Sequence, residues 1–274
     1  MKIGTLVALL LLILAAGAAI AQSQPEEVVF SSAGRQLHGF LWKPAGSGPF
    51  RAIVWNHGSE KLPGSQPALA NFYTSHSYVF FVPHRRGQGR SPGSYIQDEV
   101  AQAGLGQRAG RVVELLQAEA DDVIAGLNYL KSQPFVDPAR IAISGCSYGG
   151  IETLFAGEHD LGVKALVPFA PGAMSWDMNG ELQDRLLRAV DQAKAPVFLL
   201  QAKNDFSLAP SHALSKEANK KHKEFQSKIY PAFGKSHHDG HWEFCSTATE
   251  VWGADVLAFL EAQMKPPVGE SPAH

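Results

Sequence analysis

Cysteine and charge are both scarce in this sequence of 274 residues, which contains two cysteines and 18% charged residues. Two thiols are too few for a disulfide-dense scaffold or a four-thiolate zinc site. The net charge of −2 lacks the basic excess of nucleic-acid-binding proteins, so we expect no nucleic-acid partner. With 45% hydrophobic residues the chain is also too apolar to be disordered. It is therefore expected to fold around a sizeable hydrophobic core.

No apolar run long enough to span a membrane follows residue 21, but one precedes it. Lys2 stands before the apolar stretch 6–14, and Ala19-Ile20-Ala21 has the small residues of a cleavage site. This pattern is typical of a secretory signal peptide and predicts removal of residues 1–21. An uncleaved membrane anchor is the alternative, because residues 6–21 could just cross a bilayer. We expect export to a periplasm or the medium, with no stable membrane span after cleavage.

Short apolar runs alternate with segments of helical periodicity along the rest of the chain. Residues 52–55 and 78–82 are apolar throughout, which is typical of strands buried on both faces. Residues 112–130 follow the period of an amphipathic helix, whose acidic residues Glu119, Asp121 and Asp122 are expected mostly to face solvent. This alternation predicts an α/β fold with a mostly parallel central sheet covered by helices on both faces. Strands are expected at 28–30, 37–42, 52–55, 78–82, 141–143, 165–167, 197–200 and 225–230, and helices at 112–130, 150–155, 211–221 and 247–264.

One domain is expected over residues 22–265. Within it, residues 172–195 are polar and helix-prone between two strands, and could form a small cap over a pocket. Residues 266–274 are rich in proline, glycine and serine and are expected to form a flexible tail. The sequence does not specify an oligomeric state.

Ser147 is the candidate nucleophile. It is the centre of a G-x-S-x-G pattern, residues 145–149, that follows the strand expected at 141–143 and precedes the helix expected at 150–155. This strand–turn–helix context is what a nucleophile elbow requires, because the tight turn lifts the hydroxyl above the sheet. The N–H of the next residue, Tyr148, would then face the developing oxyanion. A glycine-rich turn with an idle serine is the alternative.

A serine hydroxyl needs a base to accept its proton, and in the chain order Ser, acid, His the base comes last. His237, His238 and His241 lie after the strand expected at 225–230. His241 is favoured because Gly240 before it lets the backbone turn sharply, and His238 is the second candidate. The histidines and a neighbouring aspartate could also bind zinc. Their spacing matches no zinc motif, so no metal is expected.

Asp205 is the candidate acid, because it follows the strand expected at 197–200. Its carboxylate would fix the tautomer of the histidine and stabilise the imidazolium. The alternative role is to cap the helix expected at 211–221, but Asp205 stands rather far ahead of that helix.

The second oxyanion donor is expected in the loop after residues 52–55. Gly58 allows the backbone to approach a substrate, and the N–H of Ser59 or Gly58 could bind the oxyanion together with Tyr148. His57 precedes the nucleophile in the chain and is expected to shape this loop.

The glycines of loop 83–91 superficially suggest a dinucleotide-binding fingerprint. Pro92 occupies the place of its third glycine, so no cofactor is expected. We expect Arg85 and Arg86 to anchor loops rather than to attract an anionic substrate.

Taken together, these motifs resemble those of the α/β-hydrolase superfamily, and within it the dienelactone-hydrolase-like family. The resemblance covers nearly all of the chain after residue 21 and implies that Ser147, Asp205 and His241 are nucleophile, acid and base. The name-giving members use a cysteine nucleophile where this chain has serine, so a serine esterase is expected. The chain also resembles the hydrolase domains of prolyl oligopeptidases. The motifs that carry the resemblance are His57-Gly58, residues 86–91, 145–150 and 201–205, Tyr230-Pro231 and Asp239-Gly240-His241.

The expected function is that of an exported serine hydrolase that cleaves small-molecule carboxylic esters through an acyl-enzyme. A peptidase or amidase with the same machinery is one alternative, and a non-enzymatic binding protein on the same scaffold is another. Cys146 adjoins Ser147, and Cys245 lies four residues after His241. If the triad forms, both cysteines are drawn to one region, where export would permit a disulfide. The alternative is two buried thiols.

Overall fold

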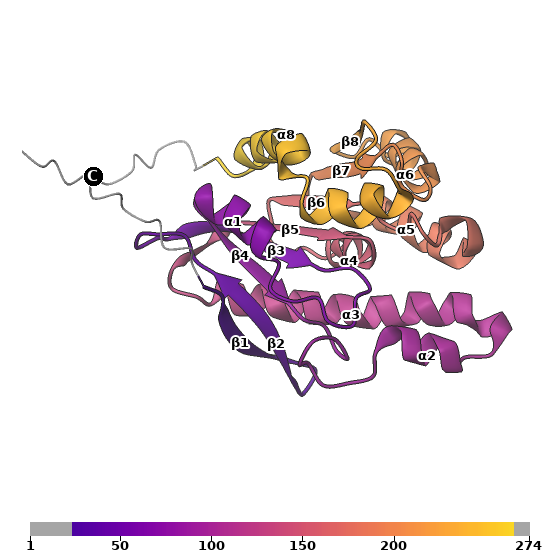
Figure 1. Ribbon diagram of the computed structural model, residues 1–274, viewed down its shortest axis with the longest axis horizontal. Coiled ribbons are helices and arrows are strands. Elements are labelled where there is room, and N and C mark those ends of the chain that lie inside the picture. The colour runs from indigo at the N-terminus through magenta and orange to yellow at the C-terminus, as the bar shows by residue number, and fades with distance from the viewer. Residues whose placement is uncertain (1–23, 266–274) are drawn as a thin grey trace, which may run out of the picture.

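The computed structural model describes residues 24–265 and contains one eight-stranded sheet between two layers of helices (Figure 1). The strand order is β1-β2-β4-β3-β5-β6-β7-β8. β2 is antiparallel to both of its neighbours, and the remaining neighbours are parallel. The fold is therefore the expected α/β-hydrolase fold. The strands are β1 Glu26–Ser32, β2 Arg35–Trp42, β3 Phe50–Asn56, β4 Tyr78–Pro83, β5 Val136–Cys146, β6 Ala165–Phe169, β7 Val197–Ala202 and β8 Phe225–Tyr230.

Successive side chains of the central strands enter two separate cores, because neighbouring residues of a strand point to opposite faces. In β3, Ile53 packs with the helices of one face and Val54 with those of the other. This explains why the central strands are apolar at every position. One face is covered by α1 Pro67–Ser75, α7 Phe244–Ser246 and α8 Thr249–Gln263, and the other by α2 Ile96–Gln102, α3 Arg108–Lys131, α4 Tyr148–Ala156, α5 Gly180–Gln192 and α6 Ala209–Lys220. Figure 1 shows α3 and α8 on opposite sides of the sheet.

All eight expected strands are present, and the four expected helices are confirmed as α3, α4, α6 and α8. Helices α1, α2 and α7 are additional. Residues 172–195 contain a 3₁₀ turn and α5, which packs against α3, α4 and α6 in the helical layer. Leu182 and Leu186 of α5 are fully buried in that core. The expected signal peptide and C-terminal tail lie outside the described residues.

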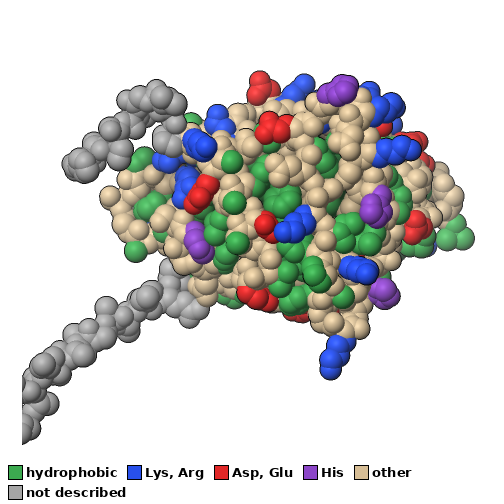
Figure 2. Space-filling model, turned by 90° about the horizontal axis from the view of Figure 1, so that it is seen from above, with side chains coloured by type: hydrophobic (Ala, Val, Ile, Leu, Met, Phe, Trp, Pro, Cys, Tyr) green, Lys and Arg blue, Asp and Glu red, His purple; other side chains and the backbone are tan. Residues whose placement is uncertain are grey.

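The face seen in Figure 2 carries acidic and basic side chains interspersed among apolar ones. Its charge is therefore mixed rather than of a single sign. Within residues 24–265, every helix is too short or too polar to cross a bilayer.

Candidate active site

Ser147 occupies the sharp turn between β5 and α4. Its backbone has φ 58° and ψ −116°, outside the regions that residues with a side chain ordinarily adopt, and α4 begins at the next residue. Such a conformation costs about 1–3 kcal/mol and persists only where the surrounding structure enforces it. The side chain is 5% exposed. This geometry matches the expected nucleophile elbow.

The glycines around Ser147 are required by close approach of backbone to backbone. A Cβ on Gly149 would lie 1.9 Å from the carbonyl oxygen of Asn56, at the end of β3. A Cβ on Gly145 would lie 2.5 Å from the carbonyl oxygen of Gly149. Both distances are far below van der Waals contact, so the turn and the first residues of α4 fit against β3 only with glycine at these positions.

The structure brings His241 and Asp205 together. Nδ1 of His241 lies 2.8 Å from Oδ1 of Asp205, and both side chains are fully buried. The other carboxylate oxygen of Asp205 accepts a hydrogen bond of 2.9 Å from Gln201 Nε2, and Oδ1 also accepts one of 2.6 Å from the Phe206 N–H. The carboxylate is thus held on two sides, and it fixes the plane of the imidazole.

Nε2 of His241 has no hydrogen-bond partner among residues 24–265, although it is buried. In the same part of the chain, the Ser147 hydroxyl forms no hydrogen bond with His241. The two segments are nevertheless adjacent, since the carbonyl oxygen of His241 lies 4.0 Å from Sγ of Cys146, the residue before Ser147. Hydrogen bonds between a nucleophile and its base are often long in the absence of substrate.

The expected reason for choosing His241 was wrong in one respect. Gly240 has no positive φ, so the backbone makes no glycine-specific sharp turn there. Residues 239–243 instead form a π-helical turn, and a Cβ on Gly240 would lie 2.6 Å from Oδ1 of Asn204. Glycine is therefore needed for close packing against the loop that carries Asp205.

The other two histidines of this segment have different surroundings. His237 Nδ1 lies 2.9 Å from the carbonyl oxygen of Asn204, and the ring of His238 stacks on Trp242 with 5.0 Å between centroids. It is His241, and not His238, that bonds to Asp205. Among the described residues, no group of three or more histidine, cysteine, aspartate or glutamate side chains is arranged to hold a metal ion.

The carbonyl groups of the loop that follows β3 are held by side chains of the next loop and of its neighbour Tyr95. Arg85 donates hydrogen bonds of 2.9 Å to the carbonyl of His57 and 2.7 Å to that of Gly58. Tyr95 donates a hydrogen bond from its hydroxyl to the carbonyl of Ser59, and Gln88 donates one of 2.9 Å to the carbonyl of Glu60. Within residues 24–265, neither the Gly58 nor the Ser59 N–H is engaged in a hydrogen bond, which leaves both available to an oxyanion.

Arg85 also connects this loop to the helices α3 and α4. Its guanidinium lies 3.1 Å from Glu119 of α3 and 2.9 Å from Glu152 of α4, and all three side chains are at most 2% exposed. Asp122 is fully buried too and binds Arg86 at 2.7 Å. The expectation that the acidic residues of α3 mostly face solvent is therefore wrong for Glu119 and Asp122, while the expected anchoring role of both arginines is confirmed.

His57 is buried beside Arg85. Its Nδ1 lies 3.0 Å from the carbonyl oxygen of Gly58, which shapes the loop as expected. Burial first, and then the positive charge of Arg85, hold the pKa of His57 well below its ordinary value. The ring is therefore neutral at neutral pH.

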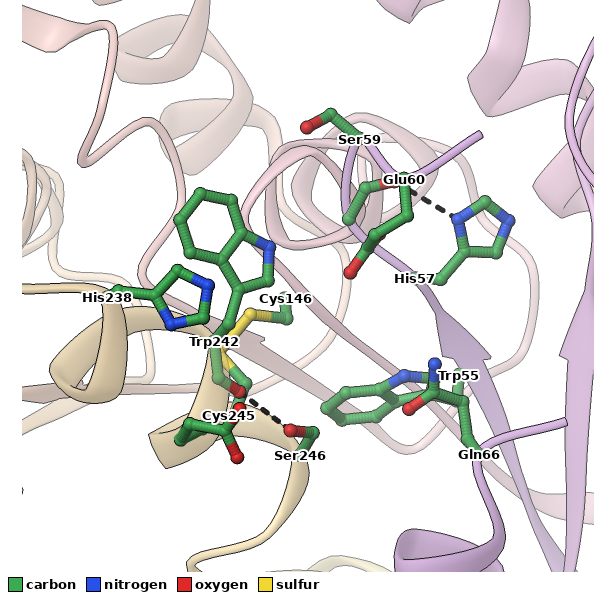
Figure 3. A pocket seen from close by; sticks show the side chains of 12 residues that line it. Trp55, His57, Ser59, Glu60, Gln66, Cys146, His238, Trp242, Cys245 and Ser246 are labelled. Carbon is green, nitrogen blue, oxygen red and sulfur yellow. Dashed lines mark hydrogen bonds between the residues drawn. A yellow bond between two sulfur atoms is a disulfide. The ribbon is translucent and has the colours of Figure 1, made fainter. Parts of the chain in front are cut away.

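Cys146 and Cys245 form a disulfide with 6.0 Å between their Cα atoms, which decides between the cross-link and two buried thiols, a choice that the sequence left open. The disulfide lines a cavity of about 400 Å³ together with Trp55, Trp242 and Glu60. Figure 3 shows Trp242 and His238 on one side of this cavity and Trp55 on the other, with the disulfide between them.

A second cavity, of about 170 Å³, contains Ser147 itself. Ser59, in the loop after β3, lines both cavities. Gly172, Met174 and Ser175 also line the small cavity. The start of the segment expected to form a cap therefore borders the nucleophile, although α5 itself belongs to the helical layer.

Three elements of this site carried no assigned role in the sequence reasoning: Gln201, Tyr95 and the pair Glu119–Glu152. Gln201 lies inside an apolar strand, and a buried polar residue at such a position signals a partner at the strand end. Glu119 lies four residues from both Leu115 and Val123, on the apolar stripe of α3, so its helical position also carried a signal.

Comparison with known proteins places the fold and the family of the chain. Over 44 residues the chain is 52% identical to a probable dipeptidyl-aminopeptidase B of Metarhizium robertsii, a match that covers 16% of this chain and 5% of that protein. An acylaminoacyl peptidase of Pyrococcus horikoshii has a similar fold, with a TM-score of 0.65 and 21% identity over 91% of this chain and 43% of the peptidase. An esterase of Pyrococcus furiosus aligns with a TM-score of 0.64 and 14% identity over 88% of this chain and 91% of the esterase.

The chain thus spans less than half of the acylaminoacyl peptidase and matches only a small part of the aminopeptidase. At these identities the two solved structures establish the fold. A model of the dienelactone hydrolase family matches residues 73–262, which include Ser147, Asp205 and His241. Because this match extends over most of the sequence, the chain belongs to the dienelactone hydrolase family.

Proposed function

We propose that this protein is an exported serine hydrolase that cleaves carboxylic esters with Ser147 as nucleophile, His241 as base and Asp205 as acid. The observation that carries the proposal is the pairing of a strained serine turn with a histidine whose Nδ1 is fixed by a carboxylate while its Nε2 has no partner. An unpaired buried nitrogen costs stability, so its presence in a fold calls for an explanation, and accepting the serine proton is one.

In the proposed reaction, His241 Nε2 takes the proton of Ser147 as Oγ attacks the acyl carbon. The carbonyl π electrons move to the oxygen, which the N–H groups of Tyr148 and of Gly58 or Ser59 stabilise. The C–O bond to the alcohol then breaks, and the alcohol leaves with the proton held by His241. Water then attacks the acyl carbon while the same ring takes its proton. The bond between the acyl carbon and Oγ breaks, Ser147 takes the proton back from His241, and the acid is released.

Orientation of the loop after β3 supports the oxyanion assignment. Arg85, Tyr95 and Gln88 hold the carbonyl oxygens of residues 57–60, while within residues 24–265 the N–H groups of Gly58 and Ser59 form no hydrogen bond. Preorganised donors of this kind contribute a large share of catalysis in acyl transfer.

Export rests on the expected signal peptide at residues 1–21 and gains support from the disulfide. Disulfides persist in secreted or periplasmic proteins and are rare in the reducing cytosol.

A peptidase or amidase is the second candidate, favoured by the fold shared with the acylaminoacyl peptidase. Both reactions use the same machinery, so the substrate distinguishes them. We favour esters because family membership points to a hydrolase named for ester-type bonds. A binding protein without activity is the third candidate.

The test is labelling with a fluorophosphonate followed by peptide mapping, together with hydrolysis of p-nitrophenyl esters and peptide p-nitroanilides. We expect an adduct on Ser147, absent in Ser147→Ala, and a kcat for esters at least 10³-fold lower in Asp205→Asn. Faster cleavage of anilides than of esters would favour the peptidase. A folded protein that is neither labelled nor active would favour the binding protein.

A further inference from the structure

The disulfide joins two segments that are 99 residues apart in the chain. Cys146 is the last residue of β5 and directly precedes Ser147. Cys245 lies in α7, about one helical turn after His241. The covalent link therefore connects the segment that carries the proposed nucleophile to the segment that carries the proposed base.

The polar contacts of the base segment point mostly toward the acid. Asn204 Nδ2 donates hydrogen bonds of 2.8 Å to the carbonyls of Phe233 and Ser236, and His241 itself bonds to Asp205. Toward the nucleophile the situation differs. Within the described chain, residues 236–246 form no hydrogen bond with residues 147–150, and the sulfur that lies 4.0 Å from the His241 carbonyl has no proton to donate once it is oxidised.

Apolar packing supplies the remaining connection between the base segment and the sheet. The ring of Phe244, beside Cys245, lies 6.4 Å from that of Phe169 in β6. Such packing limits how far the segment can move away from the sheet. Because it is not directional, it does not fix the position of the segment along the sheet. The disulfide, in contrast, fixes one point of the segment against the residue before Ser147.

We propose that Cys146 and Cys245 are positioning residues, whose cross-link holds His241 in register with Ser147 for proton transfer. This inference rests on the proposed function. A displacement of about 1 Å in a catalytic group can cost about 100-fold in rate, so a tether of this kind acts on kcat rather than on substrate binding. The disulfide takes no part in the reaction and is neither oxidised nor reduced during it.

The role of His241 predicts how a less firmly positioned base would change the rates of ester hydrolysis. The ring must protonate the leaving alcohol. An alkoxide leaves only with this protonation, whereas p-nitrophenolate leaves without it. Loss of the cross-link should therefore slow hydrolysis of an alkyl ester more than that of an aryl ester, a difference that general destabilisation of the fold would not produce.

The experiment compares the oxidised wild type with Cys245→Ala, using p-nitrophenyl acetate and ethyl acetate as substrates. We expect kcat to fall about tenfold for the aryl ester and about 100-fold for the alkyl ester, with KM within about twofold for each. The double variant Cys146→Ala/Cys245→Ala should lose no more than the single one, since both lack the same link. Leu130→Ala, which creates a cavity at the far end of α3, controls for lowered stability.

If Cys245→Ala does not fold, the wild type is reduced with a phosphine and used in the same assays. Alkylation and mass measurement of a separate sample count its two thiols, and circular dichroism checks its fold. Unchanged kcat, equal losses for the two esters, or an equal pattern in Leu130→Ala would overturn the inference while leaving the proposed function intact. An oxidised wild type that hydrolyses neither ester and is not labelled by fluorophosphonate would overturn both.

Discussion

The guanidinium of Arg85 lies 2.9 Å from the carboxyl group of Glu152, and neither side chain is exposed to solvent. Arg85 follows β4, whereas Glu152 lies in the helix that begins directly after Ser147. The same guanidinium holds the carbonyls of His57 and Gly58. One buried cation thus connects the loop proposed to bind the oxyanion with the helix that carries the proposed nucleophile.

Replacement of Arg85 by lysine should lower kcat more than it changes KM. A lysine keeps one charge but cannot reproduce the planar fork that reaches two carbonyls and two carboxyl groups together. The loop after β3 would lose its fixed orientation, and we expect a fall in kcat of about 10- to 100-fold for p-nitrophenyl esters. Steady-state kinetics with a thermal melt measures this.

Arg86→Lys is the matched control, because Arg86 belongs to the same loop but binds Asp122 and none of these carbonyls. Equal effects of the two substitutions on kcat would show that the Arg85 contacts do not orient the loop.

Glu119 and Glu152 share the single cation of Arg85, so they are expected to differ in protonation. Burial, more than any other influence, raises the pKa of Glu152 well above its ordinary value, and the neighbouring carboxyl of Glu119 adds to the effect. We infer that Glu152 retains its proton at neutral pH while Glu119 carries the charge that balances Arg85. Burial raises the pKa of Glu119 too, but the charge of Arg85 and the hydrogen bond from it oppose that rise.

This difference predicts opposite outcomes for two glutamine substitutions. Glu152→Gln removes a group that holds its proton in the folded state but ionises in the unfolded state, so it should stabilise the protein at neutral pH. Glu119→Gln leaves the buried Arg85 without its counter-charge and should cost about 3–5 kcal/mol. Urea unfolding of both variants at pH 7 measures the contrast, and a similar cost for the two would contradict the assigned protonation.

The pH dependence of stability follows with a definite sign. A carboxyl whose pKa is raised in the folded state stabilises the fold fully below its unfolded pKa, and this contribution is lost as pH rises toward the folded value. Wild type should therefore lose stability relative to Glu152→Gln between about pH 4.5 and the raised pKa. Exposed Glu114→Gln, in α3, serves as the control and should show no such trend.

Much of this site could be predicted from the sequence because its signals are local. The pattern around Ser147 stands beside its own strand and helix, and Asp205 follows a strand of buried residues, so topology alone places both at the same edge of the sheet. The ion pairs of Arg85 could not be predicted in this way, since they depend on which loop passes which helix. Glu119 shows the limit: its position on the apolar stripe indicated burial, but only the packing of α3 against the loop after β4 reveals its partner.

The glycine at position 149 provides a test of how tightly the elbow is packed. An alanine there would place its Cβ 1.9 Å from the Asn56 carbonyl oxygen, so either α4 must move away from β3 or the strand end must shift. We expect Gly149→Ala to cost about 1–3 kcal/mol of unfolding free energy, which is typical of overpacking, and to slow fluorophosphonate labelling because the movement displaces Ser147. Gly180→Ala, at the first residue of α5, adds a Cβ that meets nothing within 4 Å and should be neutral or slightly stabilising. If both variants unfold at the urea concentration of the wild type and label at its rate, backbone contact between α4 and β3 does not hold the nucleophile in place.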